Sequence, residues 1–349
     1  MRMAKPPKFE REFAFLDGDF PLDVATWENH PDYPLHTHDF TVIVIVVHGS
    51  GINVVGKEEF PVKAGEVFVL HGTRPHGYRA TKDLSVINVV YDRTLLNQVC
   101  FDVAGLPGYQ ALFVVEPVLR LAEGEIHRHM HLDVEELAKV RGLANELERE
   151  LHAGMPRRAA VKFSDRHRMK TENSAMSSGE PGYRFIAMAH FMTLVGMLSR
   201  LYGTQPARES EKIMKIGRAI SHMERHFEEE IDLSVLAQMV GMSDRNFYRF
   251  FGKVTNESPY SYLQRLRITK AAKLLQTTDK NVTEVAFQCG FNDSSYFARQ
   301  FRRVLGVSPR EFQAGAKPAT PHDRAARNSV RAGTASKPGR RPARLKNGH

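Results

Sequence analysis

The sequence contains one pattern twice: LSVLAQMVGMSDRNFYRFFGKVTNESPYSYL at residues 233–263 and VTEVAFQCGFNDSSYFARQFRRVLGVSPREF at residues 282–312. Ala237 and Gly241 of the first copy align with Ala286 and Gly290 of the second at an offset of 49 residues. After the inner turn the offset becomes 50, which aligns Arg249, Phe251, Ser258 and Pro259 with Arg299, Phe301, Ser308 and Pro309. Such agreement indicates two copies of one structural unit.

Each copy has the features of a helix-turn-helix. A small alanine suits the close crossing of two short helices, and the glycine four residues later can adopt the positive φ of a tight turn. A polar residue then caps the second helix: Ser243 in the first copy, and Asn292 or Asp293 in the second. The sequence therefore predicts two helix-turn-helix units between residues 211 and 313.

Helical spacing divides each second helix into an apolar face and a polar face. Phe247, Phe250, Phe251, Phe297 and Phe301 fall on the inward faces. The outward faces are expected to enter the major groove of DNA and to read bases, because Arg and Ser can hydrogen-bond to base edges. The predicted DNA-binding residues are Arg245, Tyr248, Arg249, Ser294, Ser295, Ala298 and Arg299.

A continuous helix is predicted between the copies, from Pro259 to Leu275, with a length of about 25 Å at 1.5 Å per residue. We expect it to hold the second helices of the two copies, called the reading helices below, about one DNA turn apart, close to 34 Å. Together with the RLRITKAAKLL motif at 265–275, the two copies resemble the C-terminal DNA-binding domain of the AraC/XylS family. That resemblance covers about 100 residues and implies a transcription regulator that binds double-stranded DNA.

The N-terminal part has the pattern of an antiparallel β domain. Four β-branched runs occupy residues 41–47, 52–55, 66–70 and 84–91, and glycine-rich segments are expected to break the chain between them. The predicted fold class is α+β: a cupin-like β-barrel with a helical hairpin, an all-α double helix-turn-helix domain and a disordered basic tail.

The predicted domain limits are 1–130 for the sensing β domain, 131–205 for a helical dimerisation region, 211–313 for DNA binding and 314–349 for the tail. Residues 133–151 place apolar side chains at steps of three and four, a stripe that suits either packing on the barrel or a homodimer contact. Residues 156–181 lack periodicity and are predicted to form a mobile loop, and 204–210 read as a linker.

Charge and cysteine content bound the class of protein. Lys and Arg exceed Asp and Glu by nine, but residues 314–349 alone hold nine basic residues and one acidic residue, so the overall charge says little about DNA binding. Two cysteines give no disulfide framework. We expect a cytoplasmic protein without a membrane segment, since the apolar stretch 183–202 is interrupted by Arg and His.

Histidines mark the candidate ligand site of the β domain. The segments HTHDF (36–40) and AGEVFVLHGTRPHGY (64–78) resemble the cupin barrel of sugar-responsive members of the family, the rhamnose-operon activators among them. The resemblance places His36, His38 and His76 at metal-ligand positions, whereas Val42 and Ile43 stand where the family's glutamate would be. We therefore expect no metal and no cofactor, and predict that His36, His38, His76 and Tyr78 bind a small molecule, with Trp27, Phe40 or Tyr78 stacking on a sugar.

Two functions are consistent with these features. The favoured function is a ligand-responsive transcription regulator, a homodimer that senses a sugar or similar effector and has RNA polymerase as a further candidate partner. The alternative is a metal-dependent cupin enzyme fused to a DNA-binding module, which the missing glutamate disfavours. The histidines are expected both to donate to and accept from a neutral polyhydroxylated ligand, with affinity falling as the pH drops through about 6.5.

Overall fold

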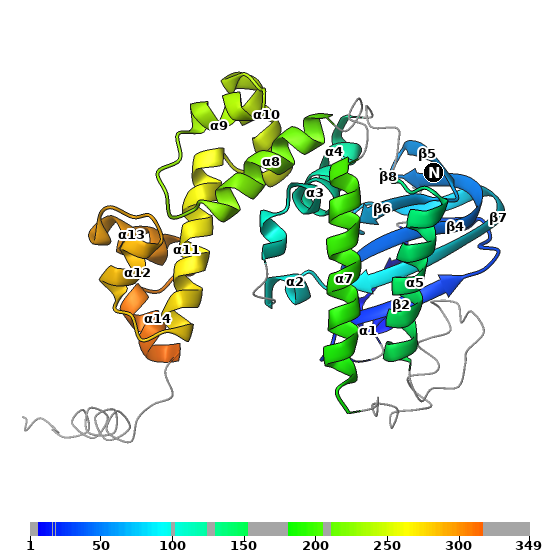
Figure 1. The fold of residues 1–349 in the computed structure, drawn as a ribbon, viewed down its shortest axis with the longest axis horizontal. Coiled ribbons are helices and arrows are strands. Elements are labelled where there is room, and N and C mark those ends of the chain that lie inside the picture. The colour runs from blue at the N-terminus through cyan, green and yellow to red at the C-terminus, as the bar shows by residue number, and fades with distance from the viewer. Residues whose placement is uncertain are drawn as a thin grey trace, which may run out of the picture. The chain divides into compact units, whose positions relative to one another are not determined.

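The computed structural model describes residues 6–15, 17, 19–98, 102–123, 130–152, 181–204 and 211–316 (Figure 1). The predicted linker from 205, nearly all of the predicted loop 156–181 and the tail from residue 317 lie outside these ranges. The fold is mixed α+β, as predicted, with a β-sheet domain followed by helix-turn-helix units. By its contacts the chain divides into two units, residues 1–263 and 264–349.

The first unit is built on one strongly bent, eight-stranded sheet. Its strands pair in the order β1-β3-β7-β4-β6-β8, with β2 also paired to β7 and β5 to β4. The pairing is antiparallel except between β1 and β3. The strands are β1 (Lys8–Phe9), β2 (Leu22–Trp27), β3 (Tyr33–His38), β4 (Thr41–Val55), β5 (Glu58–Lys63), β6 (Glu66–Leu70), β7 (His76–Tyr91) and β8 (Met130–His131).

The two longest strands are longer than predicted, and the predicted break at the glycines of β4 is wrong. β4 runs without interruption through His48–Gly51, and β7 begins at His76, eight residues before the predicted start. The pairing of β4 with β7 shifts register three times between Val46 and Ile52. Glycine here bends a continuous strand through β-bulges: Gly49 has φ +72°, and a Cβ on it would lie 2.2 Å from the carbonyl oxygen of Asp83.

Alternation along β4 divides the core into two layers. Val42, Val44 and Val46 point into the cluster inside the bent sheet, which also contains Trp27, Phe40, Tyr78, Val86 and Val90. Ile43 and Ile45 are fully buried on the opposite face. Helices α5 (Val134–Leu151) and α7 (Tyr183–Thr204) pack side by side on the sheet domain, as Figure 1 shows.

The apolar stripe of α5 is buried by contacts within the chain. Val140, Ala144, Leu147 and Leu151 are buried against α7 and the sheet, whereas Val134, the first residue of the predicted stripe, is 88% exposed. Thr26 of β2 donates a hydrogen bond to Glu148 (3.0 Å), and His152 lies 2.9 Å from the buried carboxylate of Asp23. The stripe therefore packs on the β domain, one of the two alternatives that its spacing left open.

Several short helices precede or follow the strands of the sheet in the chain. They are α2 (Thr94–Gln98), η1 (Asp102–Gly105), α3 (Pro107–Tyr109), the π-helical η2 (Gln110–Val115) and α4 (Glu116–Glu123), while α1 (Arg11–Ala14) precedes β2. Helix α8 (Glu211–Arg225) packs on η1, α3 and η2. A Cβ on Gly217 would lie 2.9 Å from the carbonyl oxygen of Pro107, and the Ser221 hydroxyl donates to the carbonyl of Gly105.

The helices α9 to α14 form the repeated units. The first copy contains α9 (Leu233–Met239) and α10 (Asp244–Thr255), and the second contains α12 (Val282–Gln288) and α13 (Ser294–Leu305). The predicted connecting helix is α11 (Pro259–Thr277), and α14 (Pro309–Ala316) follows the second copy. Gly241 and Gly290 have φ of 66° and 76°, as the tight turns require.

Among the described residues, one helix, α7, is long and apolar enough to cross a membrane. Its buried positions include Phe191, Leu194, Val195, Leu198 and Tyr202, and the Phe191 ring lies 5.0 Å from the ring of Tyr91 on β7. These contacts are those of a core helix.

Candidate functional site

A pocket opens inside the bent sheet, at the end where β3 pairs with β7. Aromatic and histidine side chains form most of its wall, together with Val42, Val44, Leu70 and Val90 from the core. The polar and aromatic lining residues are Phe9, Trp27, His30, Tyr33, His36, His38, Phe40, His76, Tyr78 and Asn88. An apolar wall with a few polar groups is the usual composition of a small-molecule site.

The structure brings together the three histidines that the sequence singled out. His36 pairs with His76 across β3 and β7, with ring centroids 4.4 Å apart, and His38 lies 4.8 Å from His76. Tyr78 lines the same pocket, and burial raises the pKa of its hydroxyl. Trp27 and Phe40, the expected stacking residues, also lie in the wall.

A fourth histidine, His30, belongs to the same pocket and was not predicted. Its ring lies 5.0 Å from Trp27 and 5.0 Å from Tyr78. Phe9, Tyr33 and Asn88 were also missed. His30 and Tyr33 lie in a segment without a clear strand pattern, and Asn88 is one polar residue in an apolar run, so only the alternation of β7 could have indicated that it faces inward.

In all four pocket histidines, one ring nitrogen, Nδ1, contacts a backbone carbonyl oxygen. The Nδ1 atoms of His30, His36, His38 and His76 lie 2.7, 3.1, 2.8 and 3.0 Å from the carbonyl oxygens of Pro31, Pro34, Phe40 and Arg74. A carbonyl oxygen can only accept, so each Nδ1 carries a proton and donates it. The expectation that these imidazoles offer both a donor and an acceptor to a ligand is therefore wrong for Nδ1, which the backbone occupies.

Burial keeps these histidines neutral. It lowers the pKa of His30, of His36 and, well below the usual value, of His76, and it lowers the pKa of His38 to about 3. The neighbouring imidazoles lower the pKa values of His36, His38 and His76 further. Burial therefore moves the expected fall in ligand affinity to a pH below 6.5, the value that the sequence alone predicts.

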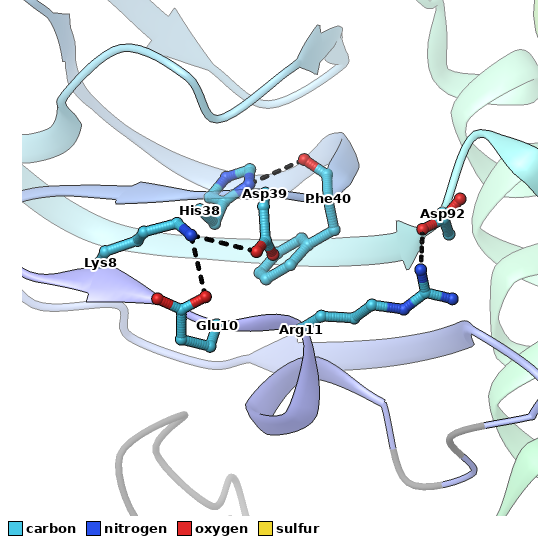
Figure 2. Close-up of polar contacts among 7 residues, drawn as sticks. All are labelled: Lys8, Glu10, Arg11, His38, Asp39, Phe40 and Asp92. Atoms are coloured by element: carbon cyan, nitrogen blue, oxygen red, sulfur yellow. Dashed lines mark hydrogen bonds and ion pairs between the residues drawn. The ribbon is translucent and has the colours of Figure 1, made fainter. Parts of the chain in front are cut away.

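The N-terminal residues form one edge of the pocket. Phe9 of β1 contacts the His36 ring edge-on at 5.1 Å. Figure 2 shows Lys8 between Glu10 and Asp39, at 2.9 and 3.2 Å, and His38 directed at the carbonyl of Phe40. Arg11 forms an ion pair with Asp92 at the end of β7, at 2.6 Å. The Lys8–Asp39 pair joins β1 to the residue after β3, beside the backbone pairing of the two strands, and the Arg11–Asp92 pair joins α1 to the end of β7.

The pocket histidines are not arranged as a metal centre. Among the described residues, no group of three or more His, Cys, Asp or Glu side chains is placed to hold a metal ion. Val42 lines the pocket and Ile43 is fully buried on the other face of β4, so the positions expected for a glutamate ligand hold apolar side chains. The group therefore does not fit a cupin metal site.

The first reading helix, α10, exposes the residues predicted to bind DNA. Arg245, Tyr248 and Arg249 are exposed, while Phe247, Phe250 and Phe251 are buried. Arg249 donates from Nη2 to the side-chain oxygen of Asn246 (3.3 Å), and its guanidinium lies 4.7 Å from the centre of the Phe250 ring. Ser243 occupies the N-cap position as predicted, without a side-chain hydrogen bond to the helix.

The second reading helix, α13, also has an exposed face and a buried phenylalanine face, and the side chains of its exposed face are smaller. Ser295 and Arg299 are exposed, Ser294 and Ala298 are partly exposed, and Phe297 and Phe301 are fully buried. Asp293 is the N-cap, and its carboxylate accepts from the backbone of Tyr296. The Arg299 guanidinium lies 5.9 Å from the Tyr296 ring.

Comparison with known families agrees with both halves of this description. A family described as an AraC-like ligand binding domain matches residues 22–152, and a helix-turn-helix domain family matches residues 236–315. The first match contains most of the pocket, and the second contains both reading helices.

Similar proteins cover most of the chain. The HTH-type transcriptional activator RhaS of Escherichia fergusonii is 30% identical over 81% of this chain and 88% of its own length. RhaS of Enterobacter sp. (strain 638) is 29% identical over 86% of this chain and 95% of its own. A crystal structure of an AraC-type transcriptional regulator from Chromobacterium violaceum is 33% identical, covering 31% of this chain and 94% of that one, with a TM-score of 0.29.

Proposed function

Because the chain belongs to the AraC family of transcriptional regulators, with a ligand-binding domain and a helix-turn-helix domain, we propose that it activates transcription in response to a neutral sugar bound in the histidine pocket. The observation that carries the proposal is the pocket itself: four neutral histidines and Asn88 set among Trp27, Tyr33 and Phe40. Polar groups that fix hydroxyls, beside aromatic faces that cover C–H groups, suit a polyol.

DNA is the second partner, and the seven predicted residues on α10 and α13 are proposed to read it. Their exposure on helices whose opposite faces are buried phenylalanines supports this assignment. RNA polymerase is a further proposed partner, and the proposed location is the cytoplasm. The relatives are transcriptional activators, which favours a regulator over the alternative cupin enzyme.

Genome-wide footprinting with and without a sugar tests the function. We expect discrete protected sites whose occupancy, or whose activity in a transcription reporter, changes when the controlled genes' sugar is added. Protected sites that respond to no sugar would contradict sugar sensing, and an absence of discrete sites would contradict sequence-specific regulation.

A homodimer is also proposed, because two copies of the reading units multiply the specificity of a site. The contact was expected through residues 133–151, where the apolar stripe is now covered inside the chain. A dimer using α5 must therefore employ its exposed side. Sedimentation decides this: a monomer at micromolar concentration with ligand and without DNA would contradict it.

A further inference from the structure

In each of the four pocket histidines, the ring nitrogen that the backbone leaves free is a hydrogen-bond acceptor, as a consequence of how the other nitrogen is anchored. Since Nδ1–H of each of the four rings donates to a backbone carbonyl and the rings are neutral, the proton cannot also sit on Nε2. The Nε2 atom of each ring therefore carries a lone pair. Backbone anchoring of this kind fixes the orientation of an imidazole as well as its tautomer.

One of these nitrogens, and one further acceptor of the pocket, are buried without a hydrogen-bond partner. His38 is only 4% exposed, and its Nε2 makes no hydrogen bond; the side-chain oxygen of Asn88 is likewise buried and unpaired. Both residues line the pocket. A buried acceptor left unsatisfied costs about 1–3 kcal/mol. Two such acceptors in one cavity therefore call for an explanation.

The pocket wall carries no compensating charge. None of its described lining residues is a Lys, Arg, Asp or Glu. A carboxylate or phosphate would place its lone pairs against those of the imidazoles with no cation to offset them, and a buried ammonium ion would lack a carboxylate. The described lining therefore suits a neutral molecule better than an ion.

We propose that the pocket selects its ligand by donated hydroxyl protons: it binds a neutral polyhydroxylated molecule through the Nε2 atoms of His30, His36, His38 and His76, and rejects the corresponding sugar acids and phosphates. The proposal rests on the proposed sensing function and makes it more specific, since each imidazole accepts from the ligand and never donates to it. Trp27 and Phe9 cover the apolar face of such a ligand.

The tautomers can be measured without a ligand. Long-range ¹H–¹⁵N correlation spectra of the labelled full-length chain distinguish a ring protonated on Nδ1 from one protonated on Nε2. Single His→Gln variants assign the four pocket rings, and His48, an exposed histidine whose Nδ1 lies 3.1 Å from the Asp83 carbonyl, serves as the reference outside the pocket. We expect Nδ1–H and bare Nε2 in all four rings at pH 7.5, and protonated Nε2 in any of them overturns the acceptor array.

Ligand selection is tested by calorimetry on the full-length chain. The neutral panel is D-glucose, D-galactose, D-mannose, D-xylose, L-arabinose, L-fucose and L-rhamnose; the charged panel is D-glucuronate, D-galacturonate, glucose 6-phosphate and D-glucosamine. We expect heat from at least one neutral sugar and none from the charged panel. Binding of a charged sugar as tight as that of its neutral parent overturns the proposal.

Deoxyfluoro analogues of the sugar that binds separate donated from accepted hydrogen bonds. Fluorine resembles a hydroxyl in size but cannot donate, so each hydroxyl that faces a histidine should lose about tenfold or more in affinity on replacement by fluorine. Unchanged affinity at every position would mean that the imidazoles donate. His48→Gln should leave the binding heat unchanged, whereas His38→Gln and His76→Gln should reduce it.

The outcomes separate this inference from the proposed function. If the tautomers are as expected but no member of either panel gives heat, sugar sensing fails while the acceptor array stands. If a neutral sugar binds but the rings carry Nε2–H, the sensing function stands and this inference fails.

Discussion

At the scale of single residues, each of the helices α10 and α13 has one arginine, proposed to read a base, that lies beside an aromatic ring. Arg249 is fixed between the Asn246 side chain and the Phe250 ring, and Arg299 lies beside Tyr296. A guanidinium oriented before binding loses less side-chain entropy when it meets a guanine edge. Asn246 was not among the predicted DNA-binding residues; its side chain accepts from Arg249, and we expect it to act by orienting that guanidinium.

Replacement of Arg249 or Arg299 by Ala should weaken binding to the cognate site by about 1–3 kcal/mol and relax discrimination at one base position each. Asn246→Ala should cause a smaller loss at the same position as Arg249→Ala. Binding titrations on a set of single-base operator variants measure both effects, with Arg141→Ala, an exposed arginine of α5, as the control for lost charge. Equal weakening on every sequence would make these arginines phosphate contacts.

Buried histidines also make stability depend on pH. Burial lowers the pKa of His38 to about 3 and that of His71 to about 3, whereas both should titrate near 6.5 in the unfolded chain. Between those pH values the unfolded state binds more protons, so the free energy of unfolding falls as the pH is lowered from about 6.5, by up to about 1.4 kcal/mol per pH unit for each histidine.

The variant His38→Gln isolates one such contribution. Its free energy of unfolding should depend less steeply on pH between 6.5 and 4.5 than that of the parent, even if the variant is less stable at pH 7.5. Urea unfolding at a series of pH values provides the slopes. Parallel slopes would show that folding does not change the pKa of His38.

At the scale of elements, what the sequence could predict depended on how local the signal is. The helices of the repeat, the capping residues and the glycine turns follow from spacing within a few residues, and the structure has them where expected. The strand β4 was predicted as two runs, because a bulge that bends a strand through Gly49 and Gly51 is indistinguishable in sequence from a turn. The strand β7 was predicted too short, because residues 76–83 (HGYRATKD) have no run of β-branched apolar residues. The convergence of His30 with His36 and His76 depends on pairing between distant strands, which periodicity does not reveal.

Two glycines in helices should respond oppositely to alanine. A Cβ on Gly108 of α3 would lie 1.9 Å from the backbone oxygen of Ser199 on α7, whereas a Cβ on Gly142 of α5 meets nothing within 4 Å. Gly108→Ala should therefore lower the free energy of unfolding by about 1–3 kcal/mol through overpacking. Gly142→Ala should raise it by about 0.5–1 kcal/mol, since alanine is the better helix former.

Thermal and urea unfolding of the two variants and of the parent protein measure these two changes in the free energy of unfolding. Because both exchanges add the same methyl group, differences in side-chain chemistry cancel. A neutral or stabilising Gly108→Ala would mean that α3 and α7 are further apart than in the structure.

At the scale of the whole molecule, the contacts place the first helix-turn-helix with the sensor and the second in a unit of its own. The division falls between Leu263 and Gln264, inside α11. The predicted limits at 205 and 211 remain a prediction, since the linker lies outside the described residues. Within the first unit, α8 packs at Gly217 and Ser221 on η1 and α3, and α10 contacts α8. The ligand-binding domain and α10 are therefore connected by packed helices.

The basic tail should add affinity for DNA without adding sequence preference. The last 36 residues hold nine Lys and Arg and one acidic residue. Such charges release counterions from DNA, and each phosphate neutralised contributes about 0.9 to the slope of log K against log salt. Deletion of residues 317–349, which leaves α14 intact, should therefore flatten this slope and leave the footprint unchanged. A full-length variant with the nine basic residues replaced by Gln distinguishes charge from length and should behave like the deletion. A shifted footprint, or a slope that the deletion leaves unchanged, would show that the tail does not act as a diffuse charge.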